Sequence, residues 1–187
     1  MFNPPILIRS RYDMDSLVHY GTDSDYVQTV LRGDIQTPWA LISIYSNAPK
    51  SPLYLTSETE EKLKSFGYVC GYTDHFGDYT ESYLRTYGNM IPMKYHVFNE
   101  EKAKEIINWV DENKNNFTTL YINCDAGISR SGAVGLFLTR YLGFNENEFL
   151  SNNPRINPNP LILKILMDSS GLTGDYEKFW ENSTIPT

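Results

Sequence analysis

A cysteine and an arginine six positions apart, Cys124 and Arg130, belong to the segment NCDAGISRS. If the residues between them curl tightly, their backbone N–H groups and the positive end of a following helix form an anion site about the size of a phosphate. Gly127 gives the freedom that such a curl needs, and the guanidinium of Arg130 can bind two phosphate oxygens at once. Since nearby cations favour the thiolate of Cys124, the spacing predicts a nucleophile that faces a bound phosphate.

The runs on either side of this segment can hold it in place. The run FTTLYIN at 117–123 precedes it and is typical of a strand, and the run GAVGLFLTRYLG at 132–143 repeats apolar residues at helical spacing. The sequence therefore predicts a strand, a glycine-containing loop and a helix in succession.

Strand-like and helix-like runs alternate along the rest of the chain, which predicts an α/β fold with a central, mostly parallel sheet flanked by helices. We expect further strands at 6–10, 39–45 and 68–74, and helices at 57–66, 99–110, 161–167 and 175–182. Between them we expect loops at 46–56 and at 75–98, the second with one helical turn. A length of 187 residues fits a single domain over residues 1–187.

Composition narrows the classes of partner. A net charge of −7 without a basic patch disfavours binding to nucleic acid or to an anionic membrane. No apolar stretch is long enough to span a bilayer, and the first residues lack the features of a signal peptide, so we expect a cytoplasmic protein. Its two cysteines are then expected to be free thiols. The three histidines lack metal-ligand spacing, so we expect no metal or other cofactor. We expect a monomer.

The segment CDAGISRS resembles the C-x5-R-[ST] signature loop of the cysteine-dependent protein-tyrosine and dual-specificity phosphatases. Neighbouring runs are similar to those of small bacterial and phage members: ILIRSR, WALISI, a strand that ends aromatic-x-Asp, the helix before the signature, and NPNPLILKIL after it. The similarity extends from about residue 6 to residue 168. It implies the parallel-sheet α/β fold of those phosphatases, in agreement with the alternation of strands and helices.

The resemblance implies roles for residues of the signature loop. Cys124 would be the nucleophile, Arg130 would bind phosphate and stabilise the transition state, and Ser131 would assist the leaving thiolate. Asn123 occupies the position of a histidine that normally orders the loop and tunes the thiol. The residues expected to bind the substrate phosphate are Asp125, Ala126, Gly127, Ile128, Ser129 and Arg130.

The reaction also needs a general acid, because an alkoxide or phenoxide leaves poorly without a proton. The resemblance implies an aspartate on a loop upstream of the signature, after a strand that ends aromatic-x-Asp. Asp74 fits this register and is preferred, and Asp78, which follows Phe76 and Gly77, is the alternative.

These residues predict a phosphomonoester hydrolase with a phosphocysteine intermediate. The expected partner is a phosphorylated protein or peptide, with phosphotyrosine as the first candidate and phosphoserine or phosphothreonine as further ones. Three alternatives stay open: a catalytically weak phosphate-binding module that recognises phosphorylated partners, a phosphatase for phosphoinositides or RNA 5′-phosphates, and redox chemistry with Cys70 as resolving thiol. The acidic chain disfavours polyanionic substrates.

Overall fold

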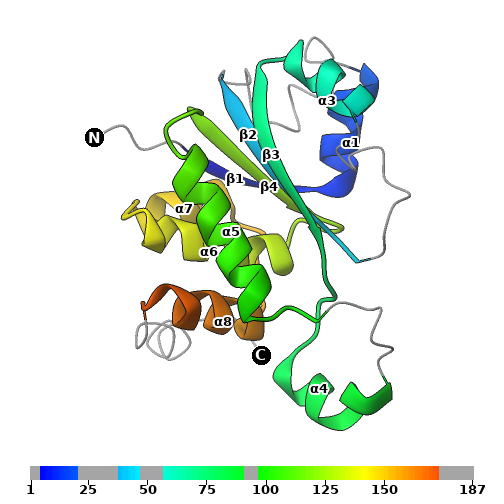
Figure 1. The fold of residues 1–187 in the computed structure, drawn as a ribbon, viewed down its shortest axis with the longest axis vertical. Coiled ribbons are helices and arrows are strands. Elements are labelled where there is room, and N and C mark those ends of the chain that lie inside the picture. Colours follow the sequence, from blue (N-terminus) through cyan, green and yellow to red (C-terminus); the bar gives the residue numbers. More distant parts are fainter. Residues whose placement is uncertain (1–4, 21–37, 47–56, 91–96, 173–187) are drawn as a thin grey trace.

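Four parallel strands form the centre of the structure, a computed structural model that describes residues 5–20, 38–46, 57–90 and 97–172 (Figure 1). Their order across the sheet is β1-β4-β2-β3. The strands are β1 (Ile6–Ser10), β2 (Trp39–Tyr45), β3 (Tyr68–His75) and β4 (Thr119–Cys124). All three strand pairings are parallel, which confirms the predicted α/β fold with a parallel sheet.

Helices cover both faces of this sheet (Figure 1). One face carries α1 (Arg11–Tyr20) and α3 (Ser57–Lys64). The opposite face carries α5 (Glu100–Asn113), α6 (Arg130–Tyr141), α7 (Glu146–Asn152) and α8 (Pro160–Ser170). A further helix, α4 (Glu81–Tyr87), projects away from these layers together with the 3-10 turn Gly88–Met90. Among the described residues, no helix is both long and apolar enough to cross a membrane.

Each face of the sheet has its own apolar cluster. The cluster under α1 and α3 contains Met14 and Leu17 of α1 and the rings of Trp39 and Tyr121. The larger cluster joins the other face to α5, α6 and α8. All seven residues of β2 are buried, because both faces of this central strand are covered. This explains why its sequence, WALISIY, is apolar except for Ser43.

Most of the expected elements are present, with three differences. The helix α1 was not expected, although Met14, Leu17 and Val18 have the i, i+3, i+4 spacing of a buried helix face. The short helix α7 was not expected either. In the predicted loop at 75–98, α4 makes about two turns instead of one. Residues 47–56 of the expected loop at 46–56, and the expected helix at 175–182, lie outside the described residues.

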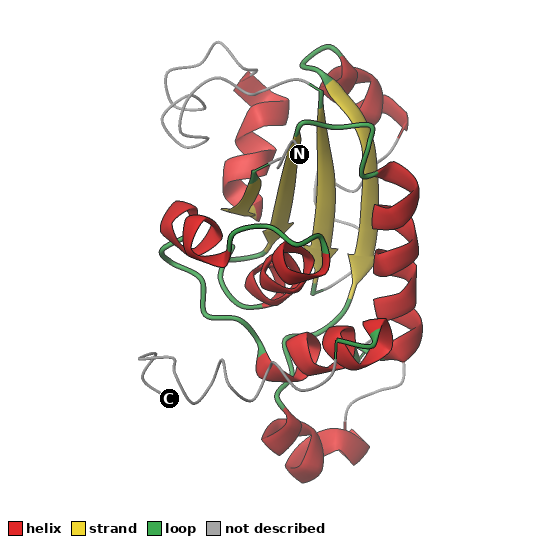
Figure 2. Ribbon diagram, turned by 90° about the vertical axis from the view of Figure 1, so that its left-hand side faces the viewer, coloured by secondary structure: helices red, strands yellow, loops and turns green. Residues whose placement is uncertain are grey.

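Parallel strands bring their carboxyl ends to one edge of the sheet, which is where ligands bind in open α/β sheets. Figure 2 shows the strand arrowheads at this common edge. Ser10 of β1 pairs with Cys124 of β4, and Ser43 of β2 pairs with Asn123. The predicted signature loop therefore leaves the sheet from one of its two central strands.

Candidate active site

The candidate nucleophile is the last residue of β4. Cys124 is 2% exposed, and its Sγ lies 3.1 Å from Oγ of Ser131, the second residue of α6. Ser131 is fully buried and can donate a hydrogen bond to a thiolate. The strand and the helix thus bring together the expected nucleophile and the hydroxyl that, by the resemblance, would assist the leaving thiolate.

Between these elements, the backbone of residues 125–129 uses its carbonyls and leaves its N–H groups available. Within the described part of the chain, the N–H groups of residues 126–129 donate no hydrogen bond. The carbonyls accept from neighbouring elements: Asp125 from the N–H of Arg11 (3.3 Å), Ile128 from Asn157 (3.2 Å), and Ser129 from Asn159 (3.2 Å) and Ala133 (2.9 Å). A loop with several free N–H donors at the start of a helix is suited to hold an anion.

Gly127 meets two steric requirements at the centre of this loop. Its φ of 67° lies in the left-handed region, which residues with a side chain rarely adopt. A Cβ atom added there would lie 2.5 Å from the carbonyl carbon of Arg9 and from the backbone nitrogen of Ser10. The curl of the loop and its close approach to the end of β1 therefore both require glycine.

Arg130, the first residue of α6, is 4% exposed and is held at both ends of its guanidinium. Its Nη1 donates to the carbonyl of Phe76 at 3.0 Å, and its Nη2 donates to Oδ2 of Asp125 at 2.7 Å. The Nε of Arg130 is buried and has no hydrogen-bond partner among the described residues. A buried charged donor without a partner is costly, so this N–H marks the side of the guanidinium that suits an anion.

Asp125, one of the residues expected to bind the substrate phosphate, contacts other residues of the site through its side chain. Besides Arg130, its carboxylate pairs with Nη1 of Arg11 at 3.1 Å and accepts a hydrogen bond from Ser46 Oγ. Partial burial raises the pKa of Asp125, but the hydrogen bonds from Ser46 and Arg130 outweigh burial and lower this pKa below its ordinary value. The carboxylate is therefore ionised at neutral pH.

Asp74, the preferred candidate for the general acid, lies on β3 and faces α5. Lys102 Nζ binds both of its carboxylate oxygens, at 2.5 and 2.7 Å, and the hydroxyl of Tyr72 lies 3.4 Å from one of them. The side chain of Asp74 is 9% exposed. Both oxygens are thus engaged on the α5 side, and no described contact joins Asp74 to the signature loop.

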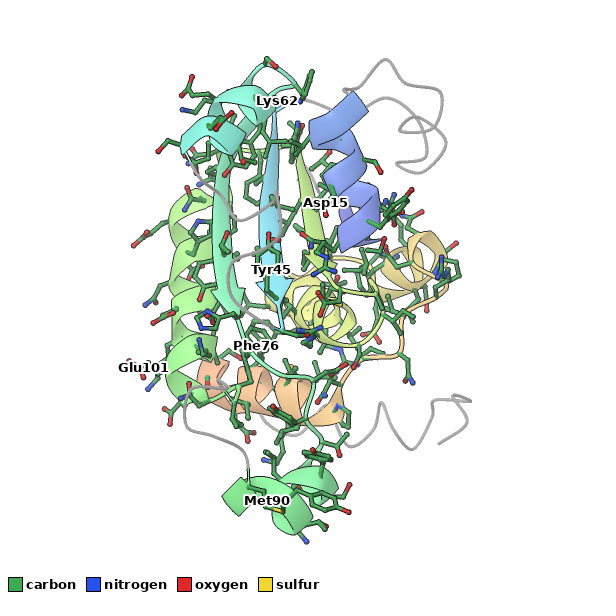
Figure 3. All side chains as sticks on the ribbon, turned by 90° about the vertical axis from the view of Figure 1, so that its right-hand side faces the viewer. Asp15, Tyr45, Lys62, Phe76, Met90 and Glu101 are labelled. Atoms are coloured by element: carbon green, nitrogen blue, oxygen red, sulfur yellow. The ribbon has the colours of Figure 1, made fainter. Side chains whose placement is uncertain are left out.

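Asp78, the alternative acid, contacts the signature loop directly. Its Oδ1 accepts hydrogen bonds from Ser129 Oγ and from Asn159 Nδ2, each at 2.8 Å. The segment that carries it leaves β3 through Phe76, whose carbonyl binds Arg130. Figure 3 shows Phe76 at this edge of the sheet, close to Tyr45 at the end of β2. The structure therefore brings Asp78, and not Asp74, into contact with the loop.

Asn123, which stands where the resemblance places a histidine, is completely buried on β4. Neither its Oδ1 nor its Nδ2 has a hydrogen-bond partner in the described part of the structure. The amide therefore makes none of the described contacts that hold the loop. Those contacts come from other elements.

Cys70 lies far from the nucleophile. It pairs with Ala40, which pairs with Leu120, four residues before Cys124 on the same strand. Four residues of strand span about 13 Å, whereas the Cα atoms of a disulfide lie within about 7 Å. Both cysteines are free, and burial raises the pKa of Cys70. This arrangement argues against redox chemistry with Cys70 as resolving thiol.

Sequence reasoning missed the residues that support the loop from other elements. Arg11 and Ser46 hold Asp125, Phe76 holds Arg130 through its carbonyl, and Asn159 holds Asp78. Only Asn159 carries a local signal, since an asparagine directly before Pro160 is typical of a helix N-cap. Among the described residues, no group of three or more histidine, cysteine or acidic side chains could hold a metal.

No family model matches the chain, and no curated protein sequence matches it. Three solved structures with similar folds are the active form of Tk-PTP, human DUSP28 and a human tyrosine phosphatase-like serine/threonine/tyrosine-interacting protein. Their identities are 14%, 13% and 13%, and their TM-scores are 0.47, 0.49 and 0.48. The matches cover 91%, 97% and 92% of this chain and 95%, 98% and 95% of theirs.

At these identities the likeness concerns the fold alone.

Proposed function

We propose that this protein hydrolyses phosphomonoesters through a phosphocysteine intermediate, with phosphotyrosine in proteins as its preferred substrate. One observation supports this most strongly: a single seven-residue loop holds a free-thiol cysteine, four N–H groups and the Nε of Arg130, and these five donors have no partner among the described residues. These groups supply a nucleophile and the donors that a phosphoryl group requires.

In the first step, the thiolate of Cys124 attacks phosphorus, so that a P–S bond forms and the P–O bond to the leaving group breaks. The loop N–H groups and Arg130 stabilise the charge on the three equatorial oxygens. The general acid gives its proton to the leaving oxygen, which departs as an alcohol or phenol.

In the second step, water attacks the phosphocysteine, the P–S bond breaks, and the general-acid carboxylate takes a proton from the water. Inorganic phosphate and the thiolate of Cys124 are released. The hydroxyl of Ser131, 3.1 Å from Sγ, can donate a hydrogen bond to this leaving thiolate.

Contact with the loop favours Asp78 over Asp74 as the general acid in this proposal. Asp78→Asn keeps an oxygen that can accept from Ser129 but cannot donate the proton of a carboxylic acid. We expect it to lower kcat/KM for phenyl phosphate about 100-fold or more and to affect nitrophenyl phosphate, with its better leaving group, much less. Asp74→Asn is the matched variant and should change kcat/KM little. If Asp74→Asn instead shows the large loss on phenyl phosphate and Asp78→Asn does not, Asp74 is the general acid.

The nucleophile is tested with Cys124→Ser, assayed on an aryl phosphate in the presence of a chelator. We expect turnover by the wild-type protein without metal and none by the variant, while Cys70→Ser stays active because Cys70 lies about four strand residues away from the loop. A wild-type protein that binds inorganic phosphate without turning over any phosphomonoester would instead be a phosphate-binding module.

Substrate choice within this proposal is tested with a panel of phosphotyrosine and phosphoserine peptides, phosphoinositides and RNA 5′-phosphates. We expect phosphotyrosine peptides to have the highest kcat/KM. A clear preference for a phosphoinositide or an RNA end would overturn the assignment of a protein substrate while leaving the phosphocysteine mechanism in place.

A further inference from the structure

Asp125 follows the nucleophile directly, and its carboxylate lies between two arginines. Arg130 binds Oδ2 at 2.7 Å, Arg11 lies 3.1 Å from Oδ1, and Ser46 donates a further hydrogen bond. The Asp125 side chain is 31% exposed, whereas that of Arg130 is 5% exposed. The carboxylate thus lies on the solvent side of the buried guanidinium.

These contacts fix the direction in which Arg130 presents its donors. A guanidinium has five N–H donors in one plane, and an oxyanion is bound best by two parallel donors on one edge. The Phe76 carbonyl occupies Nη1 and Asp125 occupies one donor of Nη2. Nε has no partner among the described residues, so the edge that Nε shares with Nη2 is the one left for an oxyanion.

The geometry points to Asp125 as a positioning residue for the reaction proposed above: with the Phe76 carbonyl, it holds Arg130 so that the Nε edge faces the phosphate. Arg11 and Ser46, which come from α1 and from the residue after β2, fix the carboxylate itself. Through Asp125, the position of the phosphate-binding arginine depends on α1 and on the end of β2. This inference rests on the proposed function.

A carboxylate beside a phosphate could instead act by repulsion and weaken binding. The charges around Asp125 oppose this role, because its single negative charge is shared between Arg11 and Arg130. The two roles predict opposite effects on phosphate binding and activity when the carboxylate is removed. Positioning predicts that activity falls, and repulsion predicts that phosphate binds more tightly.

The test compares Asp125→Ala and Asp125→Asn with Glu146→Ala. Glu146 pairs with Arg140 at 2.9 Å and is 33% exposed, so it matches Asp125 as a partly exposed arginine partner outside the signature loop. We measure kcat and KM on an aryl phosphate and the inhibition constant of inorganic phosphate. Asp125→Ala should lower kcat/KM about 10- to 100-fold and weaken inhibition by inorganic phosphate, since small misplacements of a catalytic group can cost about that much.

The other variants separate positioning from a general loss of structure. Asp125→Asn keeps an oxygen that can accept from Arg130, so we expect it to recover most of the kcat lost in Asp125→Ala, and Glu146→Ala should match the wild type. In an Arg130→Ala background, Asp125→Ala should cause no further loss, because its effect passes through the arginine. If Asp125→Ala does not fold, Ser46→Ala and Arg11→Ala should each show a smaller loss of kcat.

Two results would overturn the inference: tighter phosphate binding with a higher kcat/KM in Asp125→Ala, or a full additional loss in the Arg130→Ala background. Failure of the proposed function is a distinct outcome. If the wild-type protein does not turn over, weaker binding of inorganic phosphate to Asp125→Ala than to Glu146→Ala would still support positioning. Equal binding would reject it.

Discussion

Gly127 is the residue at which the shape of the loop is least tolerant of change. It combines a left-handed backbone with close contact to the backbone of Arg9 and Ser10, atoms that cannot rotate away as a flexible side chain can. Both conditions follow from the curl that turns the carbonyls of the loop outward. The position therefore links the stability of the fold to the presence of the anion site.

Gly127→Ala should destabilise the protein by more than the roughly 1–3 kcal/mol that a left-handed residue with a side chain costs. Gly143→Ala is the matched control, since Gly143 has a φ of 71° but an added Cβ would meet no atom within 4 Å. Urea unfolding measures both variants, and inorganic phosphate binding should weaken only in Gly127→Ala. Equal losses of stability in the two variants would contradict the close contact with β1.

Which site residues can be predicted from the sequence depends on how far apart the interacting residues lie along the chain. Cys124, Gly127 and Arg130 fall within seven positions, so their types and spacing alone predict an anion site. The hydrogen bond between Asp78 and Ser129 joins residues 51 positions apart, and the pair of Arg11 with Asp125 also depends on the fold. No local pattern reports such contacts.

At the scale of elements, the signature loop is held by the segments around it. Asn159 shows this most clearly, because one carboxamide serves α8, the segment after β3 and the candidate acid. Its Oδ1 caps α8 by accepting from the N–H groups of Leu161 and Ile162, and its Nδ2 donates to Asp78 and to the carbonyl of Tyr79. The start of α8 thereby positions the segment that carries Asp78.

Asn159→Ala should lose both functions of the carboxamide, with a stability cost of about 0.5–2 kcal/mol for the cap alone. Asn159→Ser separates the two functions, because a serine hydroxyl can cap the helix but is too short to replace the bond to Asp78. We expect Asn159→Ser to unfold near the wild-type temperature and yet share the reduced kcat of Asn159→Ala. A serine variant with wild-type kcat would show that Asp78 needs no support from α8.

What an element buries explains how well the sequence predicts most of them, but not α1, which was missed although it buries Met14, Leu17 and Val18. The strands and α5, α6 and α8 bury repeated apolar side chains, and their periodicity is sufficient to predict them. The helix α4 buries no residue, and α7 buries only Phe149, so neither produces an apolar period. In Figure 3, Met90 marks how far α4 and its 3-10 turn extend from the sheet.

At the scale of the whole molecule, an anion-binding loop with two neighbouring arginines lies in an acidic protein. Arg130 and Arg11 carry the local positive charge at the loop, whereas the chain as a whole has a net charge of −7. Local contacts act over a few ångströms, but the net charge acts on a substrate at longer range until salt screens it, with a screening length of about 10 Å at 0.1 M. Residues that flank the phosphate in a substrate therefore experience a repulsive or attractive field before the phosphate reaches the loop.

Two phosphotyrosine peptides with the same core and with either lysine or glutamate flanks should show this field. We expect the lysine peptide to have a several-fold higher kcat/KM at low ionic strength, because an acidic protein attracts it during diffusional encounter. Added sodium chloride weakens phosphate binding for both peptides, so the measured quantity is the ratio of the two kcat/KM values, with a neutral-flanked peptide as control. This ratio should fall towards one as salt rises to about 0.5 M, where the screening length is only a few ångströms. A ratio that does not change with salt would place the preference in direct contacts with residues around the loop, and a ratio below one would mean that local cations outweigh the net charge.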